Sequence, residues 1–196
     1  MNRRMIINAV GLVLRVEAVL LLLPAIVGML YGEKQTLIAF LISAALSLLL
    51  GLLPKLFLKP KTHVIYAKEG FIIVAFTWIM LSLVGAVPLV LAGAVTSYAD
   101  AFFEIVSGFT TTGSSVIPDV EVLSHGALFW RSFTHWVGGM GIIVFVMAIL
   151  PNVSERPIHI LRAEIPGPTV GKLVPRIKDT ALILYLIYIV MTVIET

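Results

Sequence analysis

The chain has 196 residues, of which 59% are apolar and only 13% are charged, and it contains no cysteine. Soluble globular domains carry about 45–50% apolar residues, so this composition excludes an ordinary soluble domain and indicates an integral membrane protein in a lipid bilayer. The lack of cysteine excludes disulfides, thiolate metal sites and cysteine nucleophiles, and the formal net charge of +3 bears on orientation only through its distribution among the loops.

Four apolar segments are long enough to cross a hydrocarbon core of about 30 Å, which takes roughly 20 helical residues. They are Met5 to Tyr31, Thr36 to Phe57, Gly70 to Leu91 and Ala127 to Leu150. A fifth apolar run starts near Lys178 and continues to Thr196. Because this run ends without a polar flank, we expect it to be a helix that is cut part-way.

Basic residues gather before the first span, between the second and third, and between the fourth and fifth. They are Arg3 and Arg4, then Lys55, Lys59, Lys61 and Lys68, then Arg156, Arg162, Lys172, Arg176 and Lys178. The segment 92–126 has no Lys or Arg and holds Asp100, Glu104, Asp119 and Glu121. The positive-inside rule therefore predicts a cytoplasmic N-terminus and places the acidic segment outside.

Three charged residues lie inside apolar runs, where a central position costs about 2.5–3.5 kcal/mol on insertion scales. We expect Arg15 and Glu17 to lie near the inner interface, with the residues before them forming an amphipathic lead-in. Arg131 lies one turn from the outer end of its span, where its long side chain can reach the interface. Anchoring or ion pairing is the simplest role for these charges.

The acidic segment contains a short apolar stretch, Ser97 to Phe109, that is too short to span. Ser97 can cap its first turn, and Asp100 three residues later completes a capping-box-like pattern. The polar hexapeptide TTTGSS follows at 110–115. This order predicts a re-entrant half-helix that enters from outside and returns as extended backbone, with the negative end of its dipole toward the membrane centre.

Irregular backbone at membrane depth lines water or is buried in protein, and its carbonyl groups can replace the hydration shell of a cation. We therefore predict a cation-selectivity filter at Thr111, Thr112, Gly113 and Ser114, with Thr112 and Gly113 as the principal carbonyl donors and Thr111 and Ser114 beside them. The hexapeptide contains no carboxylate, which favours a monovalent ion over a hard divalent one. The alternative is a polar surface turn, which Gly and Ser also form.

Several linked motifs occur in order along the chain: DAFFE at 100–104, SGFTTTG at 107–113, FWRS at 129–132, WVGGMGI at 136–142, EIPGP at 164–168 and PRIKDTA at 175–181. Together they resemble the membrane subunit of bacterial Trk/Ktr potassium uptake systems, of the TrkH type. The resemblance covers nearly the whole chain.

This resemblance implies four helix–pore-loop–helix repeats in one chain, in which Gly113 is the filter glycine of the first repeat. It also implies two leading helices, a homodimer, a cytoplasmic nucleotide-binding regulatory subunit of the TrkA type, and a place in the bacterial cytoplasmic membrane. Potassium is then the substrate, and no cofactor, nucleic acid or enzymatic activity is expected. The sequence leaves open whether transport is channel-like or a symport with protons or sodium, and how strongly potassium is selected over sodium.

The predicted fold is an all-α integral membrane protein in four parts. Residues 1–60 form a leading two-helix region, 61–151 the first repeat, 152–177 a basic cytoplasmic linker, and 178–196 the truncated first helix of a second repeat. Only one repeat is complete, so we expect either a fragment of a longer protein, which we favour, or several copies that assemble around a pore. A non-conducting assembly subunit or an inactive fragment is the alternative function.

Gly138, Gly139 and Gly141 in the fourth span either allow close helix packing or act as a gating hinge, and packing is the simpler role. His125 and His135 lack carboxylates at metal-ligand spacing, so we expect no metal site there and a hydrogen-bonding or packing role for His135. No G-x-S-x-G turn accompanies the serines, which argues against an intramembrane hydrolase.

Overall fold

The computed structural model describes residues 3–57, 67–141 and 177–195, and all regular secondary structure in these ranges is helical. The helices are α1 (Arg3–Leu20), α2 (Leu22–Leu30), α3 (Lys34–Phe57), α4 (Ala67–Leu91), α5 (Tyr98–Phe109), α6 (His125–Gly139) and α9 (Ile177–Glu195). The predicted all-α fold is confirmed.

Three segments are long and apolar enough to cross a membrane: Arg3–Leu30, which joins α1 to α2, then Lys34–Leu56 in α3 and Glu69–Leu91 in α4. They agree with the first three predicted spans. The fourth predicted span, Ala127 to Leu150, begins as α6, and its residues after Gly141 lie outside the described part of the chain. The fifth predicted helix is α9.

The break between α1 and α2 falls at Leu21, three residues before Pro24. A proline has no N–H to donate, and its ring collides with the carbonyl group four residues back, which here is that of Leu20. The chain keeps its direction across the break because the Leu21 N–H still donates to the carbonyl oxygen of Glu17 over 2.8 Å. The two helices therefore act as a single span.

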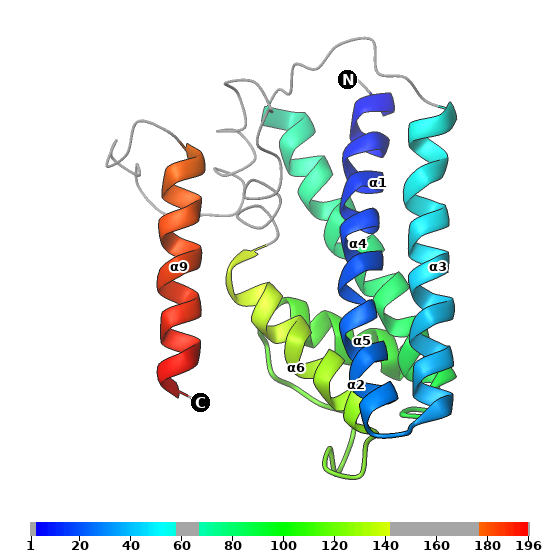
Figure 1. Cartoon of the computed structure of the whole chain (residues 1–196). Helices are drawn as coiled ribbons and strands as arrows, with labels where there is room; N and C mark the ends of the chain where they lie inside the picture. Colours follow the sequence, from blue (N-terminus) through cyan, green and yellow to red (C-terminus); the bar gives the residue numbers. More distant parts are fainter. Residues whose placement is uncertain (1–2, 58–66, 142–176, 196) are drawn as a thin grey trace.

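Helices α1, α3 and α4 run side by side along the bundle, and α5 and α6 fill the end where α2 lies (Figure 1). Helices α1 and α3 approach closely at Gly11 and Gly51, where a Cβ on Gly51 would lie only 2.6 Å from the Gly11 carbonyl oxygen. Small residues permit such backbone contact between membrane helices. The two leading helices are therefore packed as one unit.

Trp130 of α6 is the centre of the core and is 1% exposed. Its Nε1 donates to the Gly85 carbonyl oxygen over 2.9 Å. Its ring makes edge contacts with Phe40 and Phe109, with centroid distances of 6.2 and 6.5 Å. One side chain of α6 thus contacts α3, α4 and the last residue of α5.

Helix α9 packs against the end of α6 through aromatic side chains. The rings of Trp136 and Tyr188 have centroids 5.6 Å apart, and Trp136 Nε1 donates to Thr192 Oγ1 over 3.1 Å. The basic linker expected at 152–177 precedes this helix and, apart from residue 177, lies outside the described residues.

The predicted lead-in before Arg15 and Glu17 is not a separate element, and the place of these two residues near the inner interface stays a prediction. Both lie near the middle of the Arg3–Leu30 span, and the Glu17 side chain is 2% exposed within the bundle. The residues before them form no separate surface lead-in, because Met5, Ile6 and Val10 are buried as well. Arg15 Nε donates to the Gly11 carbonyl oxygen over 3.2 Å.

Candidate functional site

The short helix α5 begins at a side-chain cap and ends in a left-handed turn. Ser97 is the N-cap, and its hydroxyl accepts from the Ala99 N–H over 3.2 Å, as the sequence predicts. The described residues show no reciprocal bond from Asp100, so the full capping box is not formed there. At the other end, the N–H groups of Thr111 and Thr112 donate to the carbonyl oxygens of Gly108 and Ser107, each over 2.9 Å.

These two bonds form a Schellman motif, in which the first residue past the cap is left-handed and is usually glycine. Here that residue is Thr111, with φ of 54°. A β-branched residue in this region is a strained exception, and strain of this kind persists where surrounding structure imposes it, often at functional sites. The sequence analysis named Thr111 and Gly113 as filter residues, but nothing in the sequence indicated the left-handed backbone of Thr111.

The predicted filter residues Thr111, Thr112, Gly113 and Ser114 are all exposed in the described chain. Gly113 has a φ of 76°, and a Cβ there would meet nothing within 4 Å. Within the described residues, the carbonyl groups of 111–113 accept no hydrogen bond, whereas the Ser114 carbonyl accepts from Ser107 Oγ over 2.6 Å. Three consecutive carbonyl groups are therefore available to a ligand, and the fourth is engaged.

The last residue of the hexapeptide and the residue after it are held by the carboxylate of Glu104, which is fully buried on α5. Glu104 Oε1 accepts from Ser115 Oγ and from the Val116 N–H, both over 2.6 Å. Glu104 Oε2 accepts from Arg131 Nε of α6 over 2.8 Å, and the Arg131 side chain is 16% exposed. The ion pairing expected for Arg131 is present, and it places one carboxylate between α6 and the non-helical segment of residues 111–116, which we call the filter strand.

The end of α5 also rests against two positions on α6. A Cβ on Gly108 would overlap the Thr134 side chain, and a Cβ on Gly138 would overlap the backbone carbonyl of Phe109. A Cβ on Gly139 would instead overlap the Tyr188 hydroxyl of α9. Gly138 and Gly139 thus lie at close packing contacts. Gly141, with φ of 68°, follows the end of α6, and a gating role for these glycines stays a prediction.

The two histidines considered in the sequence make hydrogen bonds in the structure. His135 Nδ1 lies 2.9 Å from the Arg131 carbonyl oxygen, in agreement with a hydrogen-bonding role. In the ranges that the structure describes, no three His, Asp or Glu residues gather as a metal site would require.

Glu33, in the turn between α2 and α3, caps the N-terminus of α6. Its Oε1 accepts from the His125 N–H over 2.8 Å and lies 2.9 Å from His125 Nδ1, and its Oε2 accepts from the Gly126 N–H over 3.2 Å. The Tyr31 ring stacks on the His125 ring with centroids 3.8 Å apart. Burial raises the pKa of Glu33, but the hydrogen bonds and the charge of His125 outweigh this effect and hold it below the ordinary value of 4.5.

Comparison with known proteins identifies close relatives of the chain. The model of a family described as TrkH, cation transport protein, matches residues 36–196. The Trk system potassium uptake protein TrkH of Halomonas elongata is 37% identical over 98% of this chain and 40% of its own length, and that of Escherichia coli K12 is 36% identical with the same coverage. The chain thus spans about 40% of the length of these curated relatives.

A solved structure gives the same result for the fold. The crystal structure of the potassium transporter TrkH from Vibrio parahaemolyticus matches with a TM-score of 0.78 and 35% sequence identity, over 98% of this chain and 38% of the other. At this identity and coverage, the helical arrangement described above is the arrangement of that transporter's matched part.

Proposed function

The chain belongs to the TrkH family of cation transport proteins, and on that premise we propose that it supplies one selectivity-filter strand of a potassium uptake protein. The ion passes the backbone of residues 111–114, and its ligands from this chain are the carbonyl groups of Thr111, Thr112 and Gly113. The observation that carries this proposal is the run of three carbonyl groups without hydrogen-bond partners among the described residues, at the C-terminal end of α5.

The electrostatics of this position favour a cation. The C-terminal end of a helix carries a partial negative charge of about half an elementary charge, and the carbonyl dipoles add to it. The three bonds to Glu104 remove the freedom of the strand before any ion arrives, and such preorganisation reduces the entropic cost of binding. The ion is potassium in the named relatives, and we assign the same substrate to this chain.

One strand cannot enclose an ion, because a filter of this type is built from several backbone segments around an axis. Residues 110–116 are exposed, and we propose that this exposed side faces the pore axis and the strands of further repeats. The relatives extend well beyond the matched region, which leaves room for those repeats. We also propose that the intact protein forms the homodimer, and binds the nucleotide-binding cytoplasmic subunit, that the family resemblance implies.

The orientation follows from where the charged ends lie. The start of α1 and the end of α3 lie at one end of the bundle, and the turn between α2 and α3 lies at the other (Figure 1). Arg3, Arg4 and Lys55 belong to the first end, which the positive-inside rule places in the cytoplasm. The filter strand is then approached from outside, across the bacterial cytoplasmic membrane.

Rubidium uptake by a potassium-uptake-deficient strain tests the proposal, with the intact protein that contains this chain expressed from a plasmid. Gly113→Ala is expected to abolish most uptake, because an L side chain at a φ of 76° distorts the strand. Gly93→Ala is the matched control: Gly93 also has a φ of 76°, but it lies in the loop between α4 and α5. Equal uptake by the two variants would contradict the assignment of Gly113 to the filter, and no uptake by the unaltered protein would favour a non-conducting assembly subunit.

A further inference from the structure

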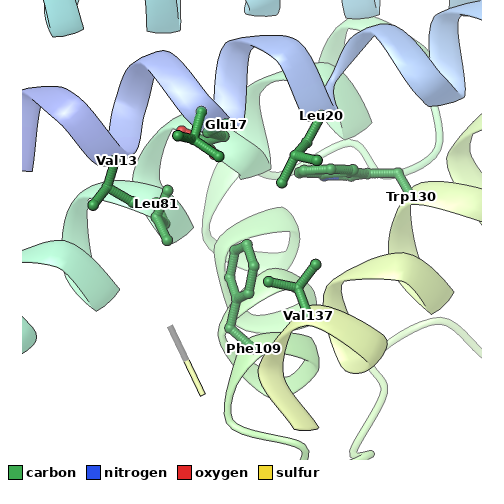
Figure 2. A pocket seen from close by; sticks show the side chains of 8 residues that line it. Val13, Glu17, Leu20, Leu81, Phe109, Trp130 and Val137 are labelled. Carbon is green, nitrogen blue, oxygen red and sulfur yellow. The ribbon is translucent and has the colours of Figure 1, made fainter. Parts of the chain in front are cut away.

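Glu17 is a buried acid that the proposed potassium pathway does not use. Its side chain is 2% exposed, near the middle of the first span. In Figure 2 it lies on α1 among apolar side chains, with Leu81 of α4, Phe109 of α5 and Trp130 of α6 around the same small cavity. Ionisable residues inside a membrane bundle are rare and usually functional.

The two short contacts of Ser47 beside Glu17 cannot both be hydrogen bonds if the Glu17 carboxylate is ionised. Ser47 of α3, which is fully buried, has its Oγ 2.8 Å from the Leu14 carbonyl oxygen and 3.0 Å from Glu17 Oε2. A serine hydroxyl has one hydrogen to donate. If Glu17 is ionised, both neighbours of Ser47 are acceptors and only one of these two short contacts can be a hydrogen bond.

If Glu17 is protonated, both short contacts of Ser47 can be hydrogen bonds. The Glu17 carboxylic acid then donates from Oε2 to Ser47 Oγ, and the Ser47 hydroxyl donates onward to the Leu14 carbonyl oxygen, so both contacts become hydrogen bonds. The other oxygen, Oε1, has no hydrogen-bond partner within the described part of the chain. An unpartnered oxygen costs far less on a neutral acid than on an anion in an apolar environment.

Among the described residues, the side chains that line the cavity provide no charge to balance an anion. The cavity is lined by Val13, Val16, Leu20, Leu81, Phe109, Trp130 and Val137 besides Glu17, and none of these side chains is charged or titrates near neutral pH. On α4, a Cβ at Gly85 would lie 3.2 Å from Oε1. Arg15, the other charged residue of this stretch of α1, directs its Nε to the Gly11 carbonyl oxygen.

We propose that Glu17 is a proton-binding site in the membrane interior, where its neutral carboxylic acid donates to Ser47 and thereby links α1 to α3. Release of this proton would leave a negative charge beside Phe109, the residue with which α5 ends before the filter strand. Because Glu17 is buried among the helices, exchange of its proton with water requires a local opening of the bundle. The site does not depend on the proposed potassium pathway.

Infrared spectroscopy of the intact protein in lipid tests this site without measuring transport. A protonated carboxylic acid has a carbonyl stretching band separate from the bands of carboxylates and amides. We expect such a band in the unaltered protein at neutral pH, its loss in Glu17→Gln, and its retention in Glu121→Gln, which removes an exposed carboxylate. The glutamine amide can still donate to Ser47, so the variant should keep the bundle intact.

Ser47→Ala provides a second, independent measurement should Glu17→Gln fail to fold. Removal of the hydroxyl that accepts from the acid should shift the carbonyl band to the frequency of a less hydrogen-bonded acid, with the band still present. The proposal is overturned if the unaltered protein lacks the band at neutral pH, or if neither Glu17→Gln nor Ser47→Ala alters it. Because transport plays no part in this measurement, its outcome is distinct from that of the rubidium assay.

Discussion

Glu104→Ala is expected to release the strand that follows the filter glycine. The substitution removes the acceptor of three hydrogen bonds, two of 2.6 Å from Ser115 and Val116 and one of 2.8 Å from Arg131. It also leaves the largely buried Arg131 without its carboxylate. Removing one partner of a buried ion pair costs about 3–5 kcal/mol, so this variant should lose both selectivity and some thermal stability.

Glu104→Gln is the sharper test, because it keeps the size of the side chain. Its amide oxygen can accept either from Ser115 and Val116 or from Arg131, and its amide NH₂ then faces an N–H donor on the remaining side. A hydrogen bond to a charged group contributes about 1.5–3 kcal/mol. If the variant loses about 2 kcal/mol of hydrogen-bond free energy, the equilibrium between the bound and the detached strand shifts toward the detached form on the order of thirtyfold.

Arg131→Met provides the comparison, since Glu104 keeps both bonds to the strand in that variant. We expect Glu104→Gln to reduce potassium-over-sodium selectivity more than Arg131→Met does, and the double variant to be less impaired than the two single effects added together. Selectivity is measured as competition of sodium with rubidium uptake in cells that contain equal amounts of folded protein. Normal selectivity in folded Glu104→Ala protein would refute the idea that this carboxylate holds the strand.

Two further predictions concern packing and pH. Gly138→Ala should lower the melting temperature of the intact protein, because the added Cβ meets the Phe109 backbone and overpacking costs about 1–3 kcal/mol. Gly139→Ala should lower the melting temperature less, because its Cβ meets only the end of the Tyr188 side chain. The reverse order of the two melting temperatures would contradict the packing role. The lowered pKa of Glu33 stabilises the fold above the ordinary value of 4.5 and ceases to do so as the pH falls through the lower folded pKa. Glu33→Gln should therefore flatten the acid side of a plot of melting temperature against pH, and an unaltered plot would contradict this role of Glu33.

Local sequence patterns were sufficient to predict the elements that local physics determines. Long apolar runs predicted the spans in α1 to α4, and a serine before a short apolar stretch predicted the start of α5 at Ser97. Each of these depends on residues within a few turns of one another, so no knowledge of the tertiary structure was needed.

The side-chain pairs of the site depend on packing between helices and were only partly predictable. An ion pair was expected for Arg131, but its partner Glu104 lies 27 residues away, and nothing local to either residue indicates the other. The residues before Arg15 were expected to form a separate lead-in, whereas Met5, Ile6 and Val10 are buried against the bundle. The left-handed Thr111 opposes the usual preference for glycine, so no sequence rule predicts it.

The most direct test of the filter assignment is the potassium-over-sodium permeability ratio of the intact protein in liposomes, measured for the unaltered protein, Gly113→Ser and Gly93→Ser. If the Thr111–Gly113 carbonyl groups bind the ion, Gly113→Ser lowers the ratio while Gly93→Ser, with the same backbone angle outside the filter, leaves it unchanged. An unchanged ratio in Gly113→Ser, in protein that is folded and conducts ions, would contradict the assignment of this strand to the filter.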